Sequence, residues 1–188
     1  MTTQEILEAA RAAKQAVALA SSRTRQSVLE RMADALCAPD SVEAILAANA
    51  EDMAAAKGHI SDVMLDRLAL TPERIGAMAK GILEVAALPD PVGAVLNRVE
   101  RPNGLVIEKT AVPMGVIAII YESRPTGTSD AAALAIKSGN ACILRCGKEA
   151  WRSAAPSSPH CAGACGRTAC PKPPSLSLRT PPTPPPTP

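Results

Sequence analysis

Aromatic side chains are almost absent from this sequence of 188 residues, which holds one tyrosine, one tryptophan and no phenylalanine. A core must therefore be built from Ala, Leu, Ile, Val and Met, which bury less area per residue than aromatic rings do, so we expect modest stability. Long apolar runs are lacking too, since none reaches the roughly 20 residues that a helix needs to cross a bilayer. These absences argue against a membrane protein.

A secretory leader is not expected, because Glu5 and Glu8 give the first residues the pattern of an amphipathic helix in place of a basic start and an apolar stretch. Without a leader, the six cysteines are better interpreted as thiols than as a disulfide framework. Cys161 and the two cysteines after it follow His160, but they lack the C-x2-C pairs typical of zinc sites. We therefore expect a cytoplasmic protein that holds no metal.

Acidic residues are missing from the last 38 positions, which hold 11 of the 18 prolines. Residues 1–150 carry 16 Lys and Arg against all 18 acids, a net charge of −2, whereas residues 151–188 carry +4. Proline removes backbone donors, and this stretch lacks a core's large apolar residues, so residues 151–188 are predicted to be a disordered tail with polyproline II character. Its four cations form no dense patch, which argues against nucleic-acid binding.

Apolar residues at helical spacing predict five helices before Pro89, and we interpret their stripes as packing faces. The expected starts are Thr2 or Thr3, Ser21-Ser22, Pro39 to Ser41, Ser61 and Thr71-Pro72. Residues 93–111 then form two β-capable runs around Asn103-Gly104, which is a strong hairpin signal because both residues tolerate positive φ.

A βαβ unit is predicted next. Val116 to Ile120 is a short run rich in β-branched residues that suits a strand buried on both faces, Asp130 to Lys137 favours a helix, and Ala141 to Leu144 is a second buried run. Two strands joined by a helix are parallel. The fold class is therefore α/β: a helical amino-terminal region, a β-hairpin, the first βαβ unit of a sheet and the disordered tail.

Polar side chains follow both predicted parallel strands. Tyr121 to Arg124 come after the first strand, and Arg145 to Lys148 come after the second. Ligands of open parallel sheets bind beyond the carboxyl ends of the strands. Two cationic clusters at matching strand ends are thus the strongest functional signal in the sequence.

The segment from about Met32 to Ala150 resembles the amino-terminal part of the gamma-glutamyl phosphate reductases (glutamate-5-semialdehyde dehydrogenases), a family related to the aldehyde dehydrogenases. Matching motifs follow one another in the right order. They are Met64 to Leu68, Leu70 to Ile75, Asp90 to Gly93, Arg101 to Leu105, Val112 to Pro125 and Lys137 to Ala141. A general aldehyde dehydrogenase is disfavoured because Tyr121 to Pro125 matches the reductase branch more closely.

The resemblance implies the first part of a nucleotide-binding domain and NADP-dependent reduction of L-glutamyl 5-phosphate to L-glutamate 5-semialdehyde in proline biosynthesis. It implies cofactor binding by Arg145, Gly147 and Lys148, whose cations suit the 2′-phosphate of NADP. It also implies that Ser123 and Arg124 bind the substrate. Solvated loop cations and structural ion pairs are the competing interpretations. By the same resemblance, the hairpin at 93–111 would help copies of the chain to associate as a homo-oligomer.

No cysteine here stands in the sequence context of the family's nucleophile, so we assign no catalytic residue and expect this truncated chain to be inactive. Cys142 is interpreted as a buried strand thiol and Cys37 as a helix-end thiol. The rival interpretation is a non-catalytic interaction protein that uses the hairpin or the proline-rich tail. Where the resemblance stops, the acid-free tail is typical of a shifted reading frame in a GC-rich gene. That hypothesis fails if neither alternative frame of the DNA resumes the family's sequence after about Ser153.

Overall fold

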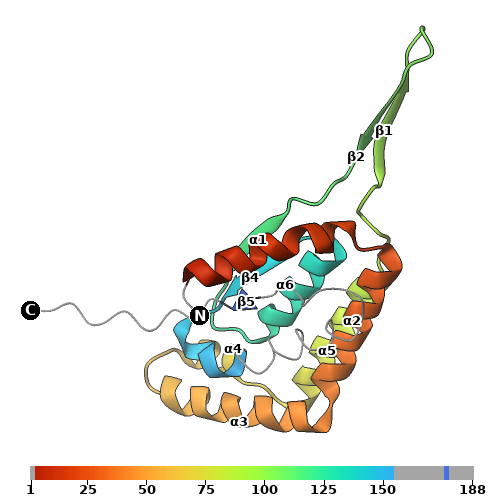
Figure 1. Ribbon diagram of the computed structural model, residues 1–188. Helices are drawn as coiled ribbons and strands as arrows, with labels where there is room; N and C mark the ends of the chain where they lie inside the picture. Colours follow the sequence, from red (N-terminus) through yellow and green to blue (C-terminus); the bar gives the residue numbers. More distant parts are fainter. Residues whose placement is uncertain (1–2, 155–175, 178–188) are drawn as a thin grey trace, which may run out of the picture.

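The computed structural model describes residues 3–154 and 176–177, which form a helical layer, a small parallel sheet and a projecting hairpin (Figure 1). In chain order the elements are α1 (Thr3–Leu19), α2 (Ser22–Cys37), α3 (Pro39–Ala56), α4 (Asp62–Leu68), α5 (Pro72–Ala87), β1 (Val95–Glu100), β2 (Val106–Thr110), β3 (Val116–Ile120), α6 (Thr126–Lys137), β4 (Ala141–Arg145), the short 3-10 helix η1 (Lys148–Ala150) and β5 (Leu176–Ser177). The predicted α/β class is confirmed.

Side-chain caps fix three of the predicted helix starts. The hydroxyls of Ser21, Ser61 and Thr71 each accept a hydrogen bond from the backbone N–H three residues later, which satisfies a donor that the first turn leaves unpaired. The start of α3 differs from the expected cap in Pro39 to Ser41. Ala38 is the N-cap there, and Pro39 occupies the first helical turn, where its missing N–H costs nothing.

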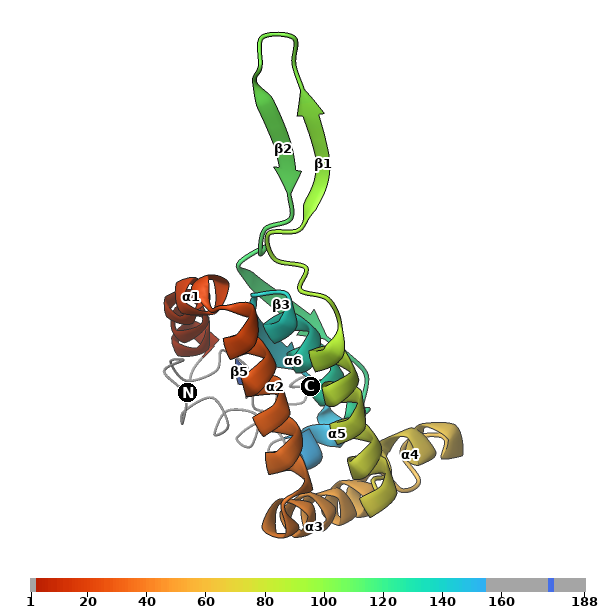
Figure 2. The ribbon, with the colours of Figure 1, turned by 90° about the vertical axis from the view of Figure 1, so that its right-hand side faces the viewer.

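The main core lies between α2, α5, α6 and β4. Leu29, Met32, Ile75 and Ile82 are among its fully buried side chains. All are aliphatic or sulfur-containing, as the shortage of aromatic residues required. The helices α2 and α5 run side by side across one side of the body, and α6 lies between them and the strands (Figures 1 and 2).

The two strands of the βαβ unit pair in parallel, from Val116 opposite Ala141 to Ile120 opposite Arg145. The strand β4 is buried along its length except at Arg145, as predicted. The prediction that residues 116–120 are buried on both faces is wrong, because their burial alternates between exposed and intermediate and Ile120 is 78% exposed. The physical reason is position: β3 is an edge strand in the order β3-β4-β5, while β4 has neighbours on both sides.

The hairpin of β1 and β2 extends away from the body as a two-stranded arm (Figures 1 and 2). Every residue of both strands is exposed. The N–H of Gly104 donates to the carbonyl of Arg101 at 2.9 Å, and Gly104 alone in this turn has a positive φ, +80°. Asn103 therefore does not adopt the positive φ that the Asn-Gly signal allowed. The turn matches a type I turn followed by a glycine in the left-handed region.

Packed structure continues past the division expected at residue 150. Residues 151–154 are helical, and Ser153 and Ala154 are buried. The buried carboxylate of Asp52 explains why, since its Oδ2 accepts hydrogen bonds from the N–H and hydroxyl of Ser153, both at 2.7 Å. The N–H of Arg152 donates to Oδ1 of Asp52 at 3.3 Å. The rest of the predicted tail lies outside the described residues, except Leu176–Ser177, which pairs in parallel with β4.

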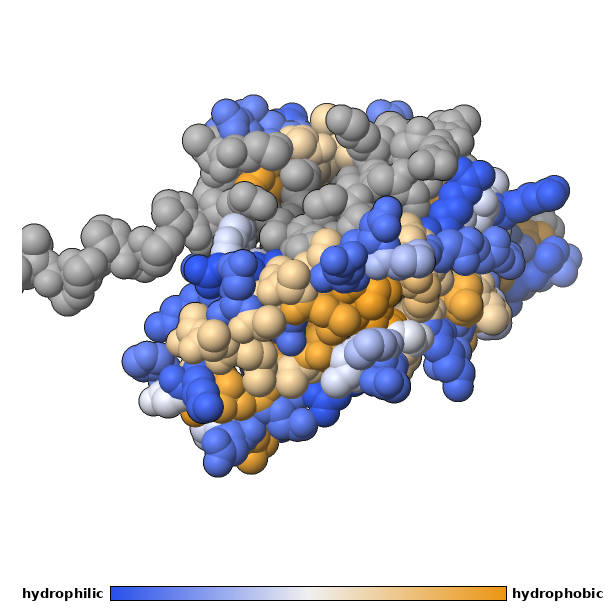
Figure 3. All heavy atoms as spheres, turned by 90° about the horizontal axis from the view of Figure 1, so that it is seen from below, coloured by the Kyte–Doolittle hydropathy of each residue, from blue (hydrophilic) through white to orange (hydrophobic). Residues whose placement is uncertain are grey.

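Much of the surface seen from below, where α3 lies lowest in Figure 1, is apolar and is bordered by hydrophilic side chains (Figure 3). In the part of the chain that the structure describes, no helix combines the length and apolar character needed to traverse a membrane.

Candidate functional site

The carboxyl ends of β3 and β4 bring the two predicted polar clusters together. The N–H of Tyr121 donates to the carbonyl of Arg145 at 3.0 Å, which extends the strand pairing by one residue. Beyond that point the loop after β3 touches the loop after β4. A Cβ built on Gly147 would lie 2.1 Å from Oγ of Ser123 and 3.1 Å from its backbone nitrogen. Because φ of Gly147 is −61°, space and not backbone conformation demands glycine here.

Ser123 links these two loops. It is buried, and its hydroxyl donates a hydrogen bond to Oε2 of Glu149. This bond, which favours the ionised carboxylate, lowers the pKa of Glu149 below its ordinary value. Ser123 thus holds the two loops together through its donor, and its predicted contact with the substrate stays a prediction.

Arg145 and Lys148 both lie exposed at the end of β4. Neither side chain forms a hydrogen bond or an ion pair within residues 3–154. Two unpaired cations beside a close-packed glycine fit a phosphorylated dinucleotide, because charge-assisted hydrogen bonds to phosphate need free donors. The residues predicted to bind NADP therefore lie together and have their donors available.

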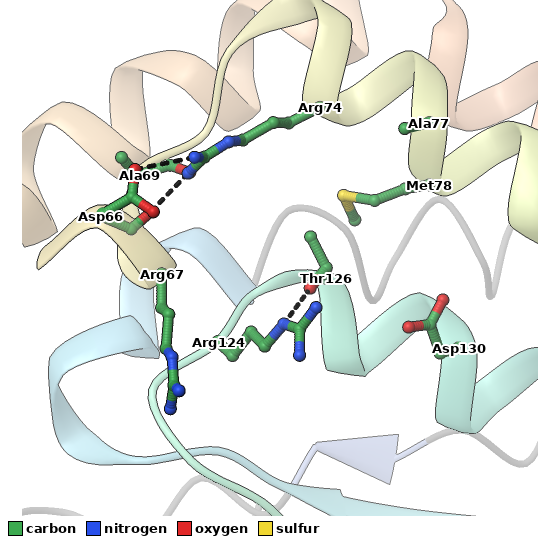
Figure 4. Close-up of a pocket in the computed structure, with 9 residues that line it drawn as sticks. All are labelled: Asp66, Arg67, Ala69, Arg74, Ala77, Met78, Arg124, Thr126 and Asp130. Atoms are coloured by element: carbon green, nitrogen blue, oxygen red, sulfur yellow. Dashed lines mark hydrogen bonds and ion pairs between the residues drawn. The ribbon is translucent and has the colours of Figure 1, made fainter. Parts of the chain in front are cut away.

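Arg124 points the other way, into a pocket of about 530 Å³ between α4, α5 and the start of α6 (Figure 4). The pocket is lined by Asp66, Arg67, Ala69, Arg74, Ala77, Met78, Arg124, Thr126 and Asp130. Three arginines and two aspartates thus surround one cavity. This composition suits a ligand that carries charge.

Two of the pocket's arginines are held by protein partners. Arg74 donates to Oδ1 of Asp66 and to the carbonyl of Ala69, both at 2.8 Å. Arg67 forms an exposed ion pair with Glu122 at 3.2 Å. These contacts place both guanidinium groups at the pocket wall (Figure 4).

Asp130 lies on the first turns of α6 and faces the same pocket (Figure 4). Burial raises the pKa of Asp130 above its ordinary value, and the positive charge of Arg124 opposes that rise. The two groups therefore interact through space.

The described cysteines do not include a nucleophile poised for catalysis. Cys142 is buried in β4, as predicted, and Cys37 is exposed at the end of α2. Cys146 follows β4, but burial raises the pKa of its thiol, with Asp52 and Glu149 adding negative charge nearby, and this opposes thiolate formation. Within the described residues no three His, Cys, Asp or Glu side chains could hold a metal ion, and Cys161 and its neighbours lie outside them.

Sequence reasoning missed several residues of this site. Arg67 and Arg74 entered only as parts of family motifs, and no local pattern ties them to Arg124, some fifty positions later. Gly127 was missed as well: a Cβ there would come within 3.2 Å of the ring of Tyr121, a contact that only the structure shows. The hydroxyl of that tyrosine bonds to Thr128 at 2.6 Å, and burial raises the pKa of Tyr121 to about 12.

Comparison with known proteins identifies close relatives, although no family model matches the chain. A gamma-glutamyl phosphate reductase of Streptococcus pneumoniae is 59% identical over 153 residues, which cover 81% of this chain and 36% of that protein. The chain thus spans about a third of the length of the curated relatives it matches.

Solved structures of gamma-glutamyl phosphate reductases also resemble this chain. The gamma-glutamyl phosphate reductase of Thermotoga maritima matches with a TM-score of 0.88 at 34% identity, covering 94% of this chain and 43% of that one. The Saccharomyces cerevisiae enzyme matches with 0.87 at 34% identity, covering 96% and 47%. A salicylaldehyde dehydrogenase of Pseudomonas putida, at 17% identity and a TM-score of 0.69 over 96% of this chain and 35% of its own, shares the fold.

Proposed function

Because the chain belongs to the gamma-glutamyl phosphate reductase family over the amino-terminal 81% of its length, we propose that it carries cofactor and substrate groups of an NADP-dependent reductase. The substrate would be L-glutamyl 5-phosphate and the product L-glutamate 5-semialdehyde, a step of proline biosynthesis in the cytoplasm. When bound, NADPH would supply the hydride, which no side chain can.

The observation that carries this proposal is the pair of exposed cations at the end of β4, which form no hydrogen bond or ion pair with a described residue. Arg145 and Lys148 would grip the 2′-phosphate and neighbouring oxygens of NADP, and Gly147 lets their loop approach the loop of Ser123. Arg124, on the opposite side of that loop, would bind an anionic part of the substrate. The proposed cofactor contacts and the proposed substrate contact thus lie on opposite sides of one loop.

We also propose that this 188-residue chain binds the cofactor without turning substrate over. Reduction of an acyl phosphate through a thioester requires a thiolate, since it must attack the acyl carbon and later leave. None of the described cysteines meets that requirement. Cys142 is buried, the pKa of Cys146 is raised, and Cys37 lies at the end of α2, outside the loops that follow β3 and β4.

Cofactor choice tests the proposal. We expect the chain to bind NADP+ more tightly than NAD+. The double variant Arg145→Gln, Lys148→Gln should lose this preference, because the loss of charge-assisted contacts should weaken NADP+ binding roughly tenfold to a hundredfold. Isothermal titration of both cofactors against both proteins measures the effect, and an NADPH oxidation assay with glutamyl phosphate should show no turnover.

A matched control is Arg101→Gln with Lys109→Gln, which removes the same charges from the distant hairpin and should leave the preference unchanged. Equal affinity of the unmodified chain for NADP+ and NAD+ would contradict the assignment of the cation pair. Measurable NADPH oxidation would contradict the expected inactivity and leave cofactor binding intact.

The hairpin supports a second role, association of copies of the chain. It exposes apolar side chains on both strands, including Leu96, Val99 and Ile107, at the end of an arm that the body does not cover. Apolar surface projecting in this way is typical of an interaction site. The same arm would serve if the chain were a non-catalytic interaction protein.

Light scattering after size exclusion tests the hairpin's role. Val99 and Ile107 face each other across the strands. Replacing both with Thr keeps the strand propensity and removes apolar area, so it should shift an oligomer toward monomer. The same change at exposed Val63 and Leu83 on the body should not. An unchanged mass for the hairpin variant would rule out association through this arm.

A further inference from the structure

Two charged side chains of the pocket have hydrogen-bonding capacity that no described residue uses. Arg124 donates through Nε to Oγ1 of Thr126 at 3.0 Å, and its two terminal nitrogens donate to no other described residue. The carboxylate of Asp130 likewise accepts no hydrogen bond within residues 3–154. It faces α5, where a Cβ added to Gly81 would lie 3.8 Å from Oδ1.

The remaining charged groups of the pocket are already engaged. Arg74 is paired with Asp66, and Arg67 is paired with Glu122. Arg124 and Asp130 are therefore the charged groups lining this pocket that form no ion pair with a described residue. These two lie close enough to interact but do not form an ion pair with each other. A cation and an anion separated in this way leave room for a group that carries both complementary charges.

We propose that Arg124 and Asp130 recognise the zwitterionic head of an α-amino acid. Arg124 would bind the α-carboxylate through its terminal nitrogens, and Asp130 would accept a hydrogen bond from the α-ammonium. Both contacts are charge-assisted and directional, so they would select an α-amino acid over a simple dicarboxylate or an amine. The inference rests on the proposed function, whose substrate is an amino-acid derivative, and specifies which end of it the pocket takes.

The loop after β3 indicates how a substrate bound at Arg124 would be oriented. Ser123 turns toward Gly147 and Glu149 at the strand ends, whereas the next residue, Arg124, turns into the pocket. A substrate held by its head at Arg124 would extend its side chain past Ser123 toward the cofactor loop. Recognition and reaction would then occur at opposite ends of one molecule, on opposite sides of this loop.

Three ligands test the contact with Arg124 and the contact with Asp130 independently. L-Glutamate carries both head groups, glutarate lacks the ammonium and 4-aminobutyrate lacks the α-carboxylate. Titrated into the 188-residue chain and followed by amide chemical shifts, L-glutamate should bind about tenfold more tightly than either analogue. Asp130→Asn should abolish the preference over glutarate only, and Arg124→Gln the preference over 4-aminobutyrate only.

Glu84→Gln, on an exposed part of α5 and paired with Lys80, is the matched control and should keep both preferences. Equal binding of L-glutamate and glutarate by the unmodified chain, or no L-glutamate binding at all, would overturn the zwitterion site. If the chain binds NADP+ but shows no such selectivity for L-glutamate, the proposed function stands and only the zwitterion site is overturned. If the chain binds neither NADP+ nor L-glutamate, the proposed function is overturned too. Should a variant fail to fold by circular dichroism, the preference of the unmodified chain decides alone.

Discussion

Asp52→Asn is expected to lower the free energy of unfolding by about 2–3 kcal/mol and the melting temperature by roughly 5–10 °C. The side chain is 1% exposed, and its carboxylate accepts four hydrogen bonds, from the N–H and hydroxyl of Ser153 and from the N–H and guanidinium of Arg152. An amide cannot replace it, because the nitrogen of Asn would turn a donor toward donors that are already buried. Thermal denaturation followed by circular dichroism measures the loss.

The neighbouring residue supplies a matched control. Glu51 pairs with the same Arg152 at 3.2 Å, yet its side chain is 70% exposed. Solvent screens such a pair, so Glu51→Gln should change the free energy of unfolding by less than about 0.5 kcal/mol. Similar losses for both variants would mean that the pairing with Arg152, and not the buried contact with Ser153, holds the residues at 151–154 to α3.

Gly147→Ala is the second change with a large expected effect. Its Cβ would lie 2.1 Å from Oγ and 3.1 Å from the backbone nitrogen of Ser123. The hydroxyl must leave its bond to Glu149, and the two loops must separate. We expect a loss of about 1–3 kcal/mol in stability, as for other overpacked sites, together with a roughly tenfold or greater loss of NADP+ affinity. Chemical denaturation and titration of NADP+ measure the two effects.

A double variant distinguishes steric crowding at residue 147 from other causes of the lost stability. Ser123→Ala combined with Gly147→Ala removes the hydroxyl oxygen from the crowded space, so the double variant should recover most of the lost stability. Ser123→Ala alone should raise the pKa of Glu149 toward its ordinary value, because it removes the hydrogen bond that favours the carboxylate. A double variant no more stable than Gly147→Ala would show that the backbone contact with residue 123 dominates.

Local chemistry made much of the fold predictable. The hydroxyls of Ser21, Ser61 and Thr71 cap helices where the sequence placed them. The β-branched run at 116–120 forms a strand, and the segment around Asn103-Gly104 forms the hairpin turn. These features depend on residues within a few positions of one another, which a single sequence displays.

Features that depend on distant residues were not predictable. A β-branched run has the same sequence pattern in an edge strand as in a central one, so the exposure of Ile120 could not be read from it. The pocket joins Arg67 and Arg74 to Arg124 through packing of α4 and α5 against α6. The packing of residues 151–154 likewise follows from Asp52, about a hundred positions earlier, and not from the composition around it.

The scarcity of aromatic residues has a spectroscopic consequence. Trp151 is the chain's single tryptophan, and it lies half-buried in the last described helical turn, next to the residues that Asp52 holds. Its emission will report the loosening of that turn, whereas far-ultraviolet dichroism will report the helices of the body. Melting curves from the two signals therefore describe different events, and any gap between them measures how far the turn detaches before the helices melt.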